Sequence, residues 1–326
     1  MTPRPAWVAH LAVVAAAVIF GSTFVVVQDG IKHARPVPFL AVRFLIGAGV
    51  LLVVSRARPG AIGGARRPGL ARAGLLAGTM LLGGYIFQTV GLQYTTTSVS
   101  AFLTYLLVVL VPVLSAVLLR RVPSGLTLVG VGLATVGLFL LTGKGVALGK
   151  GELLTVGCAF CFALHILVLS EVAPRFNTIR LNAVQLGVVG AACLVPGLWF
   201  GGYHWPLSAW LAAAYTGVMA SAVALGLQMW GQRQVGPTRT SLLLMVEPVS
   251  AAVIGAAIGE HLGWVGAAGA ALILVGIGTA EVGPMITGDS WRRRSGAAVG
   301  VAAGAPAGLS SGLSSALPVP EVAAAD

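Results

Sequence analysis

The most unusual residue of the sequence is a carboxylate, Glu247, in the middle of the apolar stretch LLLMVEPVSAA (242–252). It is the only ionisable side chain within 240–257, and Pro248 follows it directly. A charged side chain facing lipid costs about 3 kcal/mol on insertion scales, so Glu247 should face a protein interior or a water-filled cavity. There it could bind and release a proton, hold a cationic group, or act as a structural partner of a neighbouring helix. Pro248 removes a backbone hydrogen bond near Leu244 and introduces a hinge.

Two further residues could take part in binding or proton transfer. Arg43 is the only basic residue well inside an apolar run, and it could either extend to the membrane interface or hold an anionic or carboxylate group. His165 lies in CAFCFALHI (158–166). A histidine there is more often hydrogen-bonded in a core, but it could also carry a proton.

The other candidates are neutral polar or aromatic side chains expected on the wall of an interior cavity. Amides and hydroxyl groups donate and accept hydrogen bonds without charge, and aromatic rings supply apolar lining. Thr23 follows a Gly-Ser pair, so it could equally serve a close contact between helices. The candidate cavity residues are Thr23, Arg43, Gln88, Tyr105, His165, Gln185, Gln228, Trp230 and Glu247, with Tyr85 and Met245 beside them.

Motifs for catalysis or metal binding are missing from the apolar runs. These runs contain no G-x-S-x-G, no H-E-x-x-H and no paired aspartates, and the five histidines are dispersed. Cys158 and Cys161 form a C-x-x-C without a second ligand pair, so packing is the better interpretation. No catalytic residue, metal site or cofactor is predicted.

Long apolar segments must position the candidate residues. Of the 326 residues, 57% are hydrophobic and only 9% are charged, against about 25% charged in soluble domains. Apolar runs of about 20 residues can cross a bilayer as helices. The sequence therefore predicts an all-α integral membrane protein with ten transmembrane helices at 7–28, 37–55, 71–92, 98–119, 125–142, 152–170, 182–200, 207–230, 239–258 and 263–282.

The distribution of positive charge gives these helices an orientation. With the N-terminus in the cytoplasm, 15 of the 20 Lys and Arg residues fall in cytoplasmic segments and four in outer loops. Cytoplasmic segments carry such an excess, so both termini are predicted to be cytoplasmic. The net charge of +11 then reflects orientation and contact with lipid headgroups, and no nucleic-acid partner is expected.

The sequence also matches itself at an offset of about 140 residues. LAVRFLIGA (40–48) aligns with NAVQLGVVGA (182–191), and VGVGLATVGLFLL (129–141) aligns with AGAALILVGIGTA (268–280). Each half holds five predicted spans. Because five is odd, the second half must enter the membrane from the opposite side, which gives two inverted five-helix repeats, an arrangement used by transporters.

The repeat defines the predicted domains and sorts the polar candidates. The first repeat covers 1–146 and the second 147–283, while 284–326 is rich in small residues, Pro and Ser and is predicted to be a disordered cytoplasmic tail. The candidate pairs are Thr23 with His165, Arg43 with Gln185, and Gln88 with Gln228. They predict two polar clusters toward opposite mouths of a central cavity, unless Gln88 and Gln228 only finish their helices near the interfaces.

The repeat also matches Glu247 with a neutral residue. It aligns Leu107 with Glu247, and the proline of the first half, Pro112, comes five residues after Leu107. A helix break is therefore predicted in both halves, and the charge in the second half alone.

These features together resemble the EamA-type branch of the drug/metabolite transporter (DMT) superfamily, over roughly residues 7–282. The resemblance rests on GSTF (21–24), on AFLTYLLVVLVPVLSAVLLRR (101–121), on PTRTSLLLMVEPVSAAVIGAAIGE (237–260) and on GAALILVGI (269–277). Arg120-Arg121 departs from the family's Gly-Glu, which the second half keeps as Gly259-Glu260, and no substrate role is assigned to this pair.

The resemblance implies a central cavity, alternating access, and export of small metabolites, amino acids or drug-like compounds. In the absence of an ATP-binding motif, we expect a secondary transporter driven by protons or a substrate gradient in a bacterial inner membrane. Helices 125–142 and 263–282 would support the others or form a homodimer. The alternatives are an intramembrane enzyme and a non-transporting sensor or scaffold.

Overall fold

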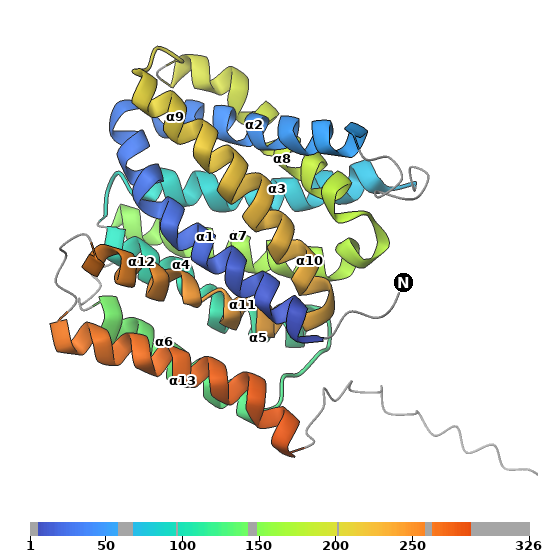
Figure 1. The fold of residues 1–326 in the computed structure, drawn as a ribbon, viewed down its shortest axis with the longest axis vertical. Coiled ribbons are helices and arrows are strands. Elements are labelled where there is room, and N and C mark those ends of the chain that lie inside the picture. The colour runs from blue at the N-terminus through green and yellow to red at the C-terminus, as the bar shows by residue number, and fades with distance from the viewer. Residues whose placement is uncertain are drawn as a thin grey trace, which may run out of the picture. The chain divides into compact units, whose positions relative to one another are not determined.

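The computed structural model describes residues 6–57, 68–95, 97–142, 149–200, 202–257 and 263–287, and this part of the chain is helical with no strand. The first group of helices is α1 (Ala6–His33), α2 (Pro36–Ala57), α3 (Leu70–Gly91), α4 (Thr97–Tyr105), α5 (Leu107–Leu118) and α6 (Gly125–Thr142). The second group is α7 (Lys150–Val172), the 3-10 turn η1 (Ala173–Arg175), α8 (Thr178–Trp199), α9 (Leu207–Thr216), the π-helix η2 (Gly217–Ala224), α10 (Leu225–Val235), α11 (Pro237–Leu243), α12 (Val246–Ala257) and α13 (Gly263–Thr287). The all-α prediction is confirmed (Figure 1).

Each predicted apolar run overlaps a helical segment. A single residue, Leu106, separates α4 from α5, and Leu244–Met245 separate α11 from α12, while α9, η2 and α10 follow one another without a gap. The tail was predicted to begin at 284, whereas α13 continues to Thr287. The residues from 288 onward lie outside the described part of the chain, as does the Gly259-Glu260 pair.

Six helical segments of the described residues are long and apolar enough to cross a membrane. They are Pro36–Ala57, Leu70–Gly91, Lys150–Arg175, Thr178–Trp199, Leu207–Val235 and Gly263–Ala280. Shorter apolar stretches lie at Trp7–Thr23, Phe102–Leu118 and Gly125–Leu141. The chain is therefore a multi-pass helical membrane protein, and the number of ten crossings stays a prediction.

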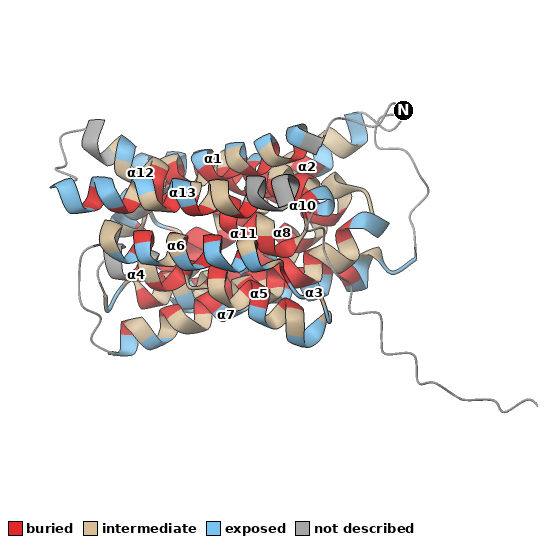
Figure 2. Cartoon of the chain, turned by 90° about the horizontal axis from the view of Figure 1, so that it is seen from below, coloured by how far each residue is buried: buried red, intermediate tan, exposed pale blue. Residues whose placement is uncertain are grey.

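The distribution of buried and exposed side chains fits a lipid environment. Exposed residues lie on the outer faces of the helices and buried residues between the helices (Figure 2). Large apolar side chains such as Leu153, Trp199 and Trp264 are among the exposed ones, and apolar surface of this extent is unusual in proteins surrounded by water. Polar and charged side chains such as Arg43 and His165 are buried inside. The interior is therefore the place for binding chemistry.

Glycines allow the helices to approach closely. Along the contact of α6 with α13, a Cβ on Gly130 would lie 2.5 Å from the carbonyl oxygen of Gly276, and one on Gly137 would lie 2.7 Å from that of Gly269. Small residues at helix contacts are the usual way to bring membrane helices together. The two helices expected to support the others thus pack on each other.

The other helix contacts come in matched sets. α2 packs against α8; α3 packs against α7 and α8, while α10 packs against α1 and η2 against α2. α12 packs against α1, and α5 packs against α7. Each of these contacts joins a helix of the first half of the chain to a helix of the second half.

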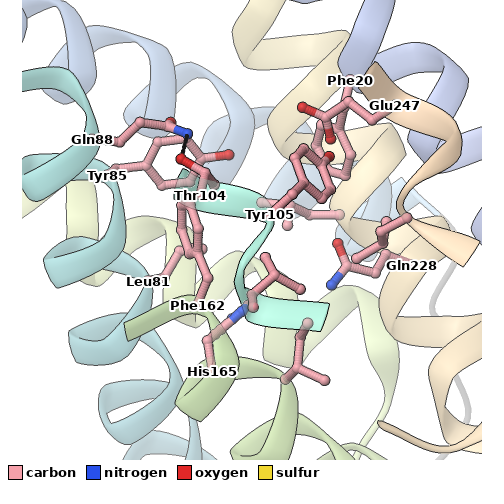
Figure 3. A pocket seen from close by; sticks show the side chains of 14 residues that line it. Phe20, Leu81, Tyr85, Gln88, Thr104, Tyr105, Phe162, His165, Gln228 and Glu247 are labelled. Carbon is pink, nitrogen blue, oxygen red and sulfur yellow. Dashed lines mark hydrogen bonds between the residues drawn. The ribbon is translucent and has the colours of Figure 1, made fainter. Parts of the chain in front are cut away.

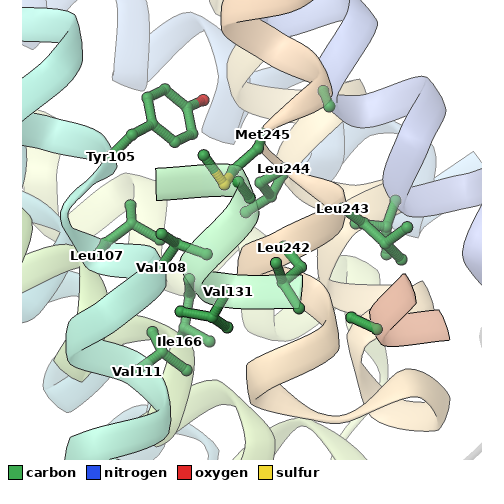
Figure 4. Close-up of a cluster of buried hydrophobic side chains, with 14 of the residues drawn as sticks. Tyr105, Leu107, Val108, Val111, Val131, Ile166, Leu242, Leu243, Leu244 and Met245 are labelled. Atoms are coloured by element: carbon green, nitrogen blue, oxygen red, sulfur yellow. The ribbon is translucent and has the colours of Figure 1, made fainter. Parts of the chain in front are cut away.

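The largest hydrophobic cluster surrounds the two helix interruptions. Leu107, Val108 and Val111 after the first interruption face Leu242–Met245 at the second, with Ile166 of α7 beside them (Figure 4). α5 contacts α11 directly. This packing holds the two interruptions close together, and the residues next to them reach the cavity described next.

Candidate functional site

A cavity lies between the two halves of the chain, beside both helix interruptions (Figure 3). Its volume is about 90 Å³, several times the roughly 10–15 Å³ that a single water molecule needs. We call it the central cavity. It is lined by Phe20, Leu81, Tyr85, Gln88, Thr104, Tyr105, Leu107, Phe162, His165, Ile166, Leu225, Gln228, Leu244 and Glu247.

A second cavity of about 60 Å³ adjoins the first, and we call it the arginine cavity. It is lined by Phe20, Thr23, Val27, Phe39, Leu40, Arg43, Tyr85, Gln88, Thr89, Leu92 and Glu247. Comparison of the two linings shows four shared residues, Phe20, Tyr85, Gln88 and Glu247. These four side chains border both cavities.

Arg43 is buried in the arginine cavity, with only 4% of its surface exposed. Its Nε donates to the hydroxyl of Ser221 at 3.2 Å, and its guanidinium carbon lies 5.1 Å from the ring centroid of Tyr85. Cation–π contacts of this kind hold a guanidinium in place. The interpretation of Arg43 as a side chain that extends to the membrane interface is therefore wrong, because the packing of α2 against α8 and η2 encloses it.

Glu247 lies in the first turn of α12 and faces both cavities. Its carboxylate interacts with the Tyr105 hydroxyl and, electrostatically, with Arg43. Arg43 and Glu247 both line the arginine cavity. Gly21 of α1 makes room here: a Cβ at Gly21 would lie 2.7 Å from the carbonyl oxygen of Glu247.

His165 belongs to a buried polar chain. Its Nε2 lies 3.0 Å from the Oε1 of Gln185, whose Nε2 donates to the Oδ1 of Asn182 at 2.8 Å. The Nδ2 of Asn182 donates to the carbonyl oxygens of Ser221 and Ala222, at 3.3 Å each. Gln185 thus supports His165 and is absent from the lining of both cavities.

Asn182 and Ser221 were not recognised from sequence. Both are fully buried. The signal for Asn182 was its spacing of three residues from Gln185, which places both amides on one face of a helix. Nothing in the sequence marks the π-helix that carries Ser221.

The other candidates are divided between the cavity walls and the core. Gln88 donates to the hydroxyl of Thr104 at 3.3 Å and, like Gln228, lines the central cavity, so neither amide merely finishes its helix. Thr23 lines the arginine cavity. Trp230 and Met245 pack in or against the hydrophobic cluster, and neither lines the two cavities.

Aromatic rings pack on one another beside the cavities. The ring of Tyr85, which lines both, meets Phe44 at 4.9 Å and Phe162 at 5.2 Å between centroids, both edge to face. A compound held here would meet aromatic rings together with a carboxylate, a guanidinium, an imidazole and amides. Among the described residues, no group of three His, Cys, Asp or Glu side chains could hold a metal ion.

Comparison with known proteins agrees with this architecture. The model of the EamA-like transporter family matches residues 7–143 and again 149–280. An uncharacterized transporter of Archaeoglobus fulgidus is 29% identical over 273 residues, which cover 82% of this chain and 84% of the relative. The uncharacterized transporter YyaM of Bacillus subtilis is 24% identical, over 80% of this chain and 89% of the relative.

A solved crystal structure has the same fold, with a TM-score of 0.74 and 20% sequence identity. The match covers 86% of this chain and 98% of that one. Family, relatives and helices together describe a transmembrane transporter. The chain belongs to the EamA-like transporter family of the drug/metabolite transporter superfamily.

Proposed function

We propose that the chain is a secondary transporter that exports small polar or amphipathic metabolites, amino acids or drug-like compounds by alternating access. The observation that carries this proposal is the position of Glu247, which lies between the central and the arginine cavity and faces both. A charged group at the junction of two cavities is accessible to an occupant of either, as a transport site must be.

The four residues that border both cavities indicate how alternating access could occur. Phe20, Tyr85, Gln88 and Glu247 come from α1, α3 and α12, which belong to different halves of the chain. A relative shift of the halves would therefore open one cavity while closing the other. Arg43 offers the positive charge that can balance Glu247, and the Tyr105 hydroxyl can hydrogen-bond to the same carboxylate.

Ten membrane crossings in two inverted repeats, 1–146 and 147–283, are part of the proposal. The family model matches the chain twice in succession, which supports a repeat. The helix contacts support it as well, if α1, α3 and α5 are equivalent to α7, α10 and α12. The contact of α3 with α7 then matches that of α10 with α1, and the contact of α5 with α7 matches that of α12 with α1. α2 with α8, and α6 with α13, pair with their own counterparts, as a twofold relation requires.

Coupling to protons and the membrane location complete the proposal. Glu247 is the carboxylate that could take up a proton during the cycle and release it on the other side. The excess of Lys and Arg in the predicted inner loops supports an orientation with both termini, including 284–326, in the cytoplasm, and a bacterial inner membrane is the location we propose. Its partners would be the substrate, protons and the lipid bilayer, with a homodimer through α6 and α13 as a further expectation.

Flux into and out of proteoliposomes tests this function. A panel of amino acids, small metabolites and cationic drug-like compounds is assayed with and without a pH gradient, for the wild type and for Glu247→Gln. We expect at least one compound to be transported and Glu247→Gln to lose that flux or its dependence on the gradient. The matched control is Glu171→Gln, which removes a half-exposed carboxylate paired with Arg121 at 3.0 Å outside both cavities. Normal transport with unchanged proton dependence in Glu247→Gln would make Glu247 structural and refute the site.

A further inference from the structure

A single series of contacts connects the two cavities through the protein interior. It starts at His165 on the wall of the central cavity and continues through Gln185 to Asn182. Asn182 contacts the backbone of Ser221, whose hydroxyl accepts from Arg43 in the arginine cavity. All five residues are at least 96% buried, and the middle three, Gln185, Asn182 and Ser221, are fully buried and line neither cavity, so hydrogen bonds among them are shielded from water.

The direction of these hydrogen bonds follows from chemistry. Backbone carbonyl oxygens only accept, so the Asn182 group that faces Ser221 and Ala222 must be its NH₂. Its Oδ1 then accepts from Gln185, whose NH₂ is turned toward it. The Oε1 of Gln185 is left to accept, and its partner is the Nε2 of His165. The Nε2 of His165 must therefore carry a hydrogen.

The anchor of this series is the π-helix η2. A π-helix is rare and frequently occurs at functional sites. In η2, two successive carbonyl oxygens, of Ser221 and Ala222, accept from one amide of a neighbouring helix. Gly217 at its start also lets η2 approach α2, since a Cβ there would lie 2.6 Å from the carbonyl oxygen of Arg43. The same element thus contacts Arg43 and fixes Asn182.

We propose that Asn182 is a positioning residue, anchored on η2, that holds His165 as the Nε2-protonated tautomer on the wall of the central cavity. In a neutral imidazole with hydrogen on Nε2, Nδ1 carries the lone pair and is the acceptor of the ring. Where this cavity is the transport site proposed above, an occupant that hydrogen-bonds to His165 does so with an N–H or O–H donor. The tautomer itself does not depend on the proposed function.

The ring nitrogens of His165 can be observed directly. Protein labelled with ¹⁵N in the histidine rings is placed in lipid nanodiscs in mildly alkaline buffer, and the His165 signals are assigned by their loss in His165→Gln. We expect one protonated nitrogen, Nε2, and one unprotonated nitrogen, Nδ1, with no second tautomer. A wild-type protein with hydrogen on Nδ1, or with a mixture of tautomers, would overturn the proposal without any variant being needed.

Asn182→Leu then tests the positioning role. It removes the contact with η2 and leaves Gln185 free to rotate, so we expect a mixture of tautomers at His165. The matched control is Gln232→Leu, because Gln232 is another buried amide that bonds to α7, at the carbonyl oxygen of Ile166 and the hydroxyl of Ser170, without contacting Gln185. It should keep the wild-type signals.

Two results would contradict the role of Asn182. One is an unchanged single tautomer in a folded Asn182→Leu protein. The other is an equal disturbance by Gln232→Leu, which would indicate general loosening of the core. Neither result bears on flux through Glu247, and a failed transport assay leaves the tautomer measurement standing, so the two proposals fail separately.

Discussion

The two helix interruptions share a backbone conformation and differ in chemistry. Leu106 between α4 and α5 has φ −55° and ψ −17°, and Leu244 between α11 and α12 has φ −64° and ψ −18°. Both tighten the helix through bonds between residues three apart, Val109 N to Leu106 O and Glu247 N to Leu244 O, each at 2.9 Å. The first interruption is followed by apolar residues, and the second is followed by Glu247 and Pro248.

This difference shows how an inverted repeat can be made functional without losing its architecture. The neutral interruption presents Tyr105 and Thr104 to the central cavity, and the charged one presents Glu247. The two therefore supply complementary halves of one site. Placing a carboxylate at the neutral interruption should therefore cost much more stability than removing the Tyr105 hydroxyl that interacts with Glu247.

The largest effect is expected from placing a carboxylate at the neutral interruption. Leu107 lines the central cavity, is 5% exposed and packs in the hydrophobic cluster. Leu107→Glu buries a charge for which this side has no guanidinium, and it should destabilise the protein by about 3 kcal/mol. Thermal unfolding in detergent measures it, with Leu107→Met as the control, expected to cost less than about 1.5 kcal/mol. A stable Leu107→Glu protein would show that the two interruptions are equally able to hold a charge.

A smaller loss of stability is expected from separating α1 from the charged interruption. A Cβ at Gly21 would come within 2.7 Å of the Glu247 carbonyl oxygen, whereas nothing lies within 4 Å of one at Gly49. Gly21→Val should therefore cost about 1–3 kcal/mol of stability, and Gly49→Val far less. Comparison of the two unfolding midpoints tests this, and equal midpoints would show that α1 is not held against α12 at this point.

The interaction between the two interruptions can be measured as a coupling energy. Tyr105 precedes the first and Glu247 follows the second, and the hydroxyl of one interacts with the carboxylate of the other. In a double-mutant cycle of Tyr105→Phe and Glu247→Gln, we expect a coupling of about 1 kcal/mol in unfolding free energy. Additive effects would mean that the two residues act independently in the folded protein. The control cycle combines Tyr203→Phe with Glu247→Gln. Tyr203 lies on the loop between α8 and α9, away from Glu247, so the effects of these two changes should be additive.

The sequence was sufficient for the helices and insufficient for their interior contacts. Long apolar runs fix where helices begin and end to within a few residues, because backbone groups in lipid must be paired internally. Which side chains meet depends on how each helix is rotated against its neighbours, and a lone arginine such as Arg43 carries no signal of that rotation. Asn182 was overlooked for the same reason, since its partners are backbone atoms of a π-helix.

The position of the first interruption was also misjudged. Pro112 leaves the carbonyl oxygen of Val108 without its helical donor, so the break was expected near Val108. It occurs at Leu106, two residues earlier, and Pro112 lies within α5. The offset between Leu106 and Leu244 is 138 residues (244 − 106), slightly less than the offset of about 140 at which the sequence matches itself. A local shift of two residues in the alignment of the two halves cannot be detected from sequence when both segments consist almost entirely of apolar residues.

The smallest effects are expected from replacing the two prolines. They test whether a proline makes the helix junction next to it easier to open. Pro248 has no N–H to offer Leu244, whose carbonyl oxygen accepts from Glu247 instead. Pro248→Ala restores a donor there and should favour a continuous helix, slowing amide hydrogen exchange across the α11–α12 junction about two- to fivefold. Pro112→Ala restores a bond to Val108, two residues beyond Leu106 and already inside α5, so exchange at Leu106 itself should stay nearly unchanged. Exchange measured by mass spectrometry on both variants in nanodiscs decides the matter. An equal effect at both junctions would mean that the prolines govern both interruptions, whereas the expected asymmetry would make the charged interruption the adjustable one.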